Sequence, residues 1–212
     1  MQQQDLEITR RSLHAVAELV LAGPQHRRSG TIKLTVQPAG FGTVAEPALS
    51  VDGTDLLIAA RRVPIAGSTC AALAVAAGVD VGAPQALYHD GSGVGPDEVL
   101  RLDPDAASWI VACWRAGDVA LRRFVPAERP ILWPEHFDVG ILIDNTSYGV
   151  SPGDDYLPEP YAYVGTSTPG DDPFWNAPFG AARTMRDLNE GDPDAVHAFF
   201  VEGRSRTGVR AG

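Results

Sequence analysis

Short alternating segments that follow one another without an intervening helix constrain the fold of this chain most strongly. Residues 31–36 alternate polar and apolar side chains, which is the pattern of a β-strand with one buried face. Two further strands are predicted at 49–51 and 54–59, separated by an Asp52-Gly53 turn of the kind that joins hairpin strands. Because consecutive strands of this kind pair as neighbours, they favour antiparallel sheet and the α+β class over alternating βαβ units.

A second run of strands is predicted in the C-terminal half, at residues 137–144, 148–151 and 161–164. The first of them alternates most clearly. Its odd-numbered residues form an apolar face, and its even-numbered residues, together with His136, form the opposite face. Helices bracket both runs, so each half of the chain is expected to contain antiparallel sheet packed with helices.

Four helices are expected, at residues 6–21, 68–77, 104–124 and 193–202. The last two each follow an Asp-Pro pair, in which Asp is a good N-cap and Pro is favoured at the first helical position. The first keeps a helical spacing of apolar residues until Gly23-Pro24, where it is expected to end. Within it, His14 and Glu18 lie one turn apart and are interpreted as a solvated pair.

The chain is long enough to form one compact domain that buries a core without disulfides. Halves 1–97 and 98–203 each show the order helix, three strands, helix, which indicates a pseudo-repeat. Residues 204–212 are expected to form a polar, flexible tail. Cys70 and Cys113 lie in alanine-rich apolar segments and are expected to be buried, inert thiols.

The charge balance disfavours several classes of partner. The formal net charge is −10, and no basic face is available to neutralise nucleic-acid phosphates or anionic lipid headgroups. No apolar stretch reaches the roughly 20 residues of a membrane-spanning helix. The N-terminus lacks the apolar core of a secretory signal. We therefore expect a soluble, cytoplasmic protein that binds neither nucleic acid nor membranes.

The segment 131–180 is the most unusual part of the chain. It contains eight acidic residues, no Lys or Arg, and nine of the 16 aromatic residues. Tyr161 and Tyr163 share one face of a predicted strand, which would place two hydroxyl groups beside each other. The residues predicted to line a ligand pocket are Trp133, Tyr148, Tyr161, Tyr163 and Trp175. The alternative is an ordinary aromatic core under long loops.

His136 and Asp138 are the sharpest candidates for chemistry. They are two residues apart on one predicted strand, so their side chains would point the same way. This spacing suits a His–carboxylate pair that transfers protons, or two ligands of a metal ion. Asp154, in a predicted turn, could join Asp138 as a metal ligand, and oxygen ligands favour calcium, magnesium or manganese over zinc. The alternative is a solvated sheet face with a structural His–Asp pair.

Two glycine motifs are not interpreted as sites. Residues 149–153 match the G-x-S-x-G nucleophile elbow, but Pro152 has no backbone N–H for the oxyanion hole that the elbow builds. Residues 91–96 resemble a dinucleotide-binding loop, but Pro96 replaces the third glycine and no strand–loop–helix context surrounds them. The first motif is predicted to be a strand that ends in a turn, and the second a flexible loop.

Three motifs of the C-terminal half carry a likeness to known proteins. They are Trp133-Pro134-Glu135-His136-Phe137-Asp138, the Pro-Gly-Asp turn at 152–154, and Pro158-Glu159-Pro160-Tyr161-Ala162-Tyr163. Together they resemble a bacterial domain family of unknown function, and weaker similarity extends to residues 30–34 and to the Asp103-Pro104 helix start. The resemblance implies a shared fold unit, and it implies no activity, because none is assigned to that family.

Three hypotheses about function follow. The first is a protein that binds a small molecule at residues 133–180, where acidic and aromatic residues would prefer a cationic or metal-bridged ligand. The second is a protein-interaction module or homodimer that uses the acidic surface and exposed strand edges, without catalysis. The third is a structural site for a divalent cation. The residues leave open whether the protein is an enzyme, and they indicate no particular cofactor.

Overall fold

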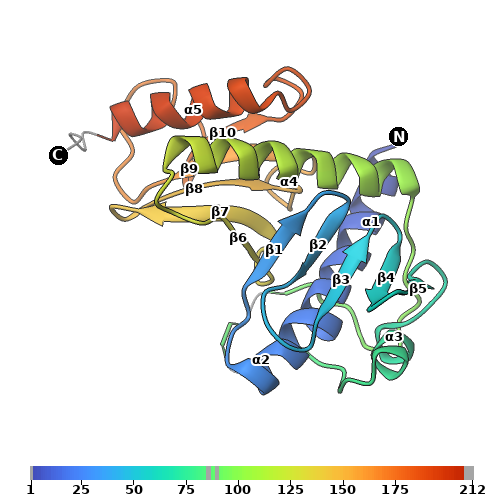
Figure 1. Cartoon of the computed structure of the whole chain (residues 1–212). Coiled ribbons are helices and arrows are strands. Elements are labelled where there is room, and N and C mark those ends of the chain that lie inside the picture. The colour runs from blue at the N-terminus through green and yellow to red at the C-terminus, as the bar shows by residue number, and fades with distance from the viewer. Residues whose placement is uncertain (1, 85–86, 89–90, 208–212) are drawn as a thin grey trace. The chain divides into compact units, whose positions relative to one another are not determined.

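The computed structural model describes residues 2–84, 87–88 and 91–207, and these residues form two compact units (Figure 1). Unit 1 comprises residues 1–111 and 132–137, and unit 2 comprises residues 112–131 and 138–212. Each unit combines helices with antiparallel strands, so the predicted α+β class is confirmed. Among the described residues, no helix combines the length and the apolar character needed to cross a membrane.

Unit 1 begins with three consecutive helical segments and continues with a meander of short strands. The helical segments are α1 (Gln3–Val16), the π-helix η1 (Ala17–Ala22), α2 (Gly23–Ser29) and, later, α3 (Cys70–Ala77). The strands are β1 (Leu34–Gln37), β2 (Gly40–Thr43), β3 (Leu49–Asp52), β4 (Asp55–Ile58), β5 (Arg61–Pro64) and β6 (Ile131–Trp133). They lie in the order β6-β1-β2-β3-β4-β5, and neighbouring strands are antiparallel. β6 pairs with β1 at Leu132 and Leu34.

The core of unit 1 lies between its first helical segments and its strands. Leu13, Val20 and Leu21 are fully buried on the helical side, and Phe41 and Leu56 are fully buried on the strands. The short helix α3 is capped at its N-terminus by the Thr69 hydroxyl and ends at Gly78, whose left-handed backbone (φ 67°) suits glycine. The end at Ala77 agrees with the prediction, and the helix begins two residues later than predicted, at Cys70.

The first helical stretch does not end at Gly23-Pro24, and that prediction is wrong. The Gly23 N–H bonds to the Glu18 carbonyl, five residues back, which is the π-helical pattern. Pro24 follows at the start of α2, and the Leu19 carbonyl, five residues before it, accepts the Gly82 N–H at 2.9 Å instead. The widened turn therefore lets the helical path continue to Ser29.

Unit 2 contains most of α4 (Pro104–Phe124), a four-stranded antiparallel ladder and α5 (Pro193–Arg206). The strands are β7 (Asp138–Ile143), β8 (Thr146–Ser151), β9 (Tyr161–Gly165) and β10 (Gly180–Thr184), in the order β10-β9-β8-β7. Asp103 and Asp192 cap α4 and α5, since each carboxylate accepts a backbone N–H of the first turn. Both Asp-Pro helix starts are therefore confirmed.

Helices α4 and α5 cover the same face of this ladder. A Cβ on Gly117 of α4 would lie 2.6 Å from Val150, and a Cβ on Gly203 of α5 would lie 2.6 Å from Val164. Figure 1 shows α5, in red, running along the strands. Fully buried Phe200 fills the space between α5 and the sheet. Tyr161 and Tyr163 lie on the opposite face, because they alternate with Ala162 and Val164 along β9.

The predicted repeat of three strands in each half is wrong. β2 and β5 add strands to the first run, and β6 and β10 add strands to the second. The extra strands were missed because they lack a clear apolar alternation: β2 reads Gly-Phe-Gly-Thr, β5 is almost entirely exposed, and β10 consists mainly of small residues. Of the predicted tail, residues 204–206 belong to α5, and residues 208–212 lie outside the described residues.

Candidate functional site

Asp138 and Tyr163 form a hydrogen-bonded pair on the face of unit 2 opposite the helices. Asp138 begins β7 and is only 6% exposed, and its carboxylate accepts the hydroxyl of Tyr163 from β9. Gly149 of β8 lies opposite Tyr163 in the ladder, and a Cβ there would be 2.5 Å from the tyrosine oxygen. The glycine therefore lets the ring lie across β8 to reach β7. Burial, followed by the charge of Asp138, raises the pKa of Tyr163 well above its usual value.

We expect Tyr163→Phe to lower the free energy of unfolding by about 1–3 kcal/mol. The substitution removes the donor and leaves a buried carboxylate oxygen of Asp138 without that hydrogen bond. Urea denaturation of the variant beside Tyr156→Phe would test this, because the Tyr156 hydroxyl makes an exposed hydrogen bond to the Asn176 carbonyl. Equal stability of the two variants would contradict a structural role for the Tyr163–Asp138 bond.

Asp154 organises the loop after β8. One carboxylate oxygen accepts the N–H groups of Tyr156 and Leu157, both at 2.9 Å, and the other accepts the Tyr161 hydroxyl at 2.5 Å. Both oxygens are therefore engaged by protein donors. Within the described ranges, no three His, Cys, Asp or Glu side chains gather in a way that could hold a metal ion. The predicted ligands Asp138 and Asp154 each bond to a different tyrosine.

His136 and Asp138 do not share a strand face, so the prediction of a paired arrangement is wrong. β7 begins at Asp138, and residues 134–137 form a turn in which Phe137 has a left-handed backbone (φ 56°). The His136 side chain is 62% exposed, with Nε2 3.9 Å from Glu135 Oε1. His136 belongs to unit 1 and Asp138 to unit 2. The alternation of polar and apolar residues predicted that His136 and Asp138 lie on one strand, because it carries no sign of the left-handed backbone at Phe137.

The five predicted pocket aromatics are divided among different surroundings. Tyr148 faces the helices, with its ring 4.8 Å from Phe124 and 6.0 Å from Phe200. Trp175 packs edge-on against Phe174 at 5.0 Å, and Trp133 belongs to unit 1. Tyr161 and Tyr163 do remain together, with ring centroids 6.3 Å apart. Phe179 completes this cluster, at 6.3 and 6.4 Å from them.

A different polar group in unit 1 is a stronger candidate for binding. We call it the Glu18 cluster: His14, Glu18, Tyr88 and Ser92. Glu18 lies in the π-helix η1 and is only 6% exposed. Its Oε2 accepts the backbone N–H of Ser92 at 3.1 Å and the Ser92 hydroxyl at 2.9 Å. The interpretation of His14 and Glu18 as a solvated pair is therefore wrong for Glu18. Single π-turns are frequent at functional sites.

Glycine lets the 91–96 loop close onto Glu18. A Cβ at Gly91 would lie 2.4 Å from Oε1 of Glu18, so any other residue there would force the carboxylate to move. The neighbouring Tyr88 is also affected by the carboxylate. Burial raises the pKa of the Tyr88 phenol, and the charge of Glu18 raises it further. The loop that was predicted to have no binding role thus supplies one member of the cluster, Ser92.

His14 presents a neutral imidazole beside this carboxylate. Its Nε2 lies 2.7 Å from the Pro134 carbonyl oxygen, and because a carbonyl only accepts, Nε2 must carry the proton. The ring stacks on Phe137 with centroids 4.9 Å apart and planes within 3°. Burial lowers the pKa of His14, and this effect outweighs the hydrogen bond to Pro134 and the charge of Glu18, which both raise it. In this neutral tautomer Nδ1 carries a lone pair and acts as an acceptor.

The two cysteines are inert. Cys70 and Cys113 are buried, as predicted. Burial, followed by the charges of Glu18 and Glu98, raises the pKa of the Cys70 thiol to about 12. Burial likewise raises the pKa of Cys113. Neither thiol is a nucleophile at physiological pH, because the thiolate is the reactive form.

A sequence signal for the Glu18 cluster did exist. Glu18 is the single charged residue in the run Ala-Val-Ala-Glu-Leu-Val-Leu-Ala at 15–22, a stretch apolar on every side of a helix. A charge there must be buried or face a polar partner. Comparisons with family models, curated proteins and solved structures found no match to the chain.

Proposed function

We propose that the protein binds a small organic cation through the Glu18 cluster of unit 1. The observation that carries the proposal is a carboxylate that is almost fully buried and whose hydrogen-bond donors in the described part of the chain, such as the N–H and hydroxyl of Ser92, carry no charge. A buried charge is costly unless an opposite charge or several donors compensate it. A ligand with a protonated amine would supply that compensation.

The charges around Glu18 favour a cation. Every ion pair among the described residues uses a carboxylate other than Glu18. His14 is held neutral by burial, so it does not cancel the Glu18 charge. Glu135 adds a second negative charge that is felt at Tyr88. Glu135 and His136, which lie in the region 133–180 predicted to bind a ligand, belong to the same unit as the Glu18 cluster.

The test is a thermal melt with organic ammonium compounds of increasing size, each paired with the carboxylate of the same carbon skeleton. We expect at least one amine to raise the melting temperature, since a ligand at 100 times its Kd stabilises the folded state by about 2.7 kcal/mol. Glu18→Gln keeps an oxygen that can accept the Ser92 donors but removes the charge, and it should abolish the response. Glu7→Gln, on the exposed side of α1, is the matched control and should respond normally.

Two results would contradict the proposal. One is a wild-type protein that no amine stabilises. The other is an amine response that is equal in wild type and in Glu18→Gln, because binding would then occur elsewhere. Circular dichroism of Glu18→Gln provides the folding control, and an unchanged spectrum with a lost response supports Glu18 as the counter-charge.

A further inference from the structure

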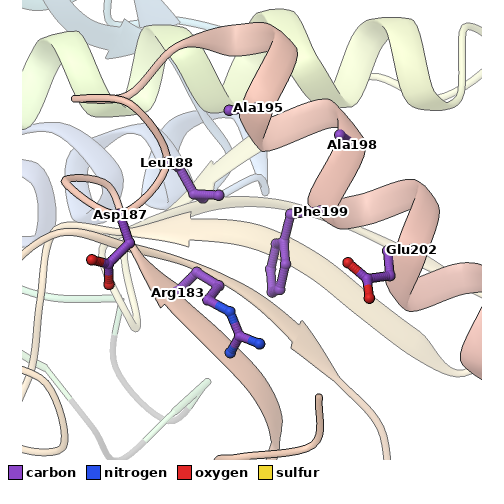
Figure 2. A pocket seen from close by; sticks show the side chains of 7 residues that line it. All are labelled: Arg183, Asp187, Leu188, Ala195, Ala198, Phe199 and Glu202. Carbon is purple, nitrogen blue, oxygen red and sulfur yellow. The ribbon is translucent and has the colours of Figure 1, made fainter. Parts of the chain in front are cut away.

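A pocket in unit 2 lies between β10, the turn that follows it, and α5 (Figure 2). Its volume is about 570 Å³, within the range of small-molecule sites. The residues that line it are Arg183, Asp187, Leu188, Ala195, Ala198, Phe199 and Glu202. Four of these are apolar, so the pocket offers an apolar surface with three charged groups around it.

Arg183 is the residue that gives this pocket its chemistry. Its guanidinium lies over the rings of Phe174 and Phe199, at 5.7 and 5.9 Å from their centroids. Nη1 also donates to the Ala182 carbonyl at 2.9 Å. These contacts hold the planar group in place, and none of the ion pairs found among the described residues includes Arg183. An arginine fixed in this way is prepared for a carboxylate, which it can bind through two hydrogen bonds.

The two acids of the lining differ in their availability. Glu202 accepts two hydrogen bonds from Arg206, at 3.0 and 2.6 Å, so its charge is offset. Asp187 is exposed, and it takes part in none of the ion pairs among the described residues. Figure 2 shows Arg183 between these two acids, with the ring of Phe199 beside its guanidinium. Asp187 should therefore weaken the binding of an anion, and its removal should strengthen it.

We infer that this pocket binds a small organic carboxylate with an apolar or aromatic body. The carboxylate would pair with Arg183, and the body would lie against Phe199 and Leu188, which supply apolar surface beside the charge. This pocket is independent of the amine site proposed in unit 1, because the two sites use different residues and bind ligands of opposite charge.

The test uses 3-phenylpropionate as the probe, titrated by isothermal calorimetry into the full chain. We expect binding with Kd of about 1 mM or tighter, a modest affinity for a ligand of this size. Arg183→Gln should weaken binding at least about tenfold, the loss of a charge-assisted bond, while Arg129→Gln, an exposed arginine of the same unit, should leave it unchanged. Asp187→Asn should tighten it by a few fold.

A second variant separates loss of binding from loss of folding. Ala198 is exposed on α5, so Ala198→Phe should fill the pocket without disturbing the core, and it should block binding while Arg183 stays in place. Phenethylamine, the probe's cationic counterpart, should not bind this pocket. Absence of 3-phenylpropionate binding to wild type would overturn the inference, as would equal affinity of wild type, Arg183→Gln and Ala198→Phe. Retained binding in Glu18→Gln would support a separate site.

Discussion

Gly23→Ala is expected to destabilise unit 1 by at least about 2 kcal/mol, because it overpacks a contact between two backbone segments. A Cβ at Gly23 would lie 1.7 Å from the carbonyl oxygen of Gly82 and 2.8 Å from its carbonyl carbon. Neither atom can rotate away as the end of a side chain would. The Gly82 N–H also bonds to the Leu19 carbonyl at 2.9 Å, so the loop cannot shift without losing this hydrogen bond to η1.

The same substitution should weaken the Glu18 cluster. Gly82 and Ser92 both bond to residues of η1, Gly82 to Leu19 and Ser92 to Glu18. We therefore expect the amine response of the protein to fall together with its stability. Chemical denaturation of Gly23→Ala beside Gly95→Ala would measure the effect, since a Cβ at Gly95 meets no atom within 4 Å. Similar stabilities of the two variants would contradict a close backbone contact between Gly23 and Gly82.

Phe200→Ala should lower the free energy of unfolding by about 3–5 kcal/mol, the usual cost of removing a buried aromatic side chain. Phe200 is fully buried, and its ring lies 5.9 Å from Phe124, 6.0 Å from Tyr148 and 6.0 Å from Phe199. It thus joins both helices of unit 2 to the strands. Alanine would leave a cavity that the two helices cannot close by a small movement.

Urea denaturation followed by far-ultraviolet circular dichroism would measure the loss. Val201→Ala is the matched control: this neighbouring side chain is 46% exposed, so its removal should cost within about 0.5 kcal/mol. A loss below about 1 kcal/mol for Phe200→Ala would mean that α5 contributes little packing energy to the unit.

The elements that the sequence predicted well are those controlled by neighbouring residues. The Asp103-Pro104 and Asp192-Pro193 starts depend on a side chain that caps the backbone two or three residues ahead. The strand at 137–144, observed as β7 over residues 138–143, depends on a local alternation of polar and apolar residues. In both cases the information lies within one window of sequence, so no distant partner has to be known.

The predictions were wrong where a contact with a distant segment overrides the local sequence pattern. Helical periodicity alone could not show that a π-turn would carry the chain past Pro24. The reversal at Phe137 is not visible in the alternation of residues 137–144, because the ring of Phe137 is buried against His14 and Phe41 in the folded unit. Local propensity is a weak determinant when tertiary packing favours another conformation.

The α+β class, the starts of α4 and α5 and the alternation of β7 could be read from local sequence, since they follow from capping, proline geometry and the period of apolar residues. Which side chains meet depends on the folded structure. Tyr163 reaches Asp138 across β8 because of the strand register and Gly149. Glu18 is buried because a loop more than 70 residues later in the sequence closes onto it. Such meetings depend on packing between remote segments, and no local pattern specifies which remote segment will arrive.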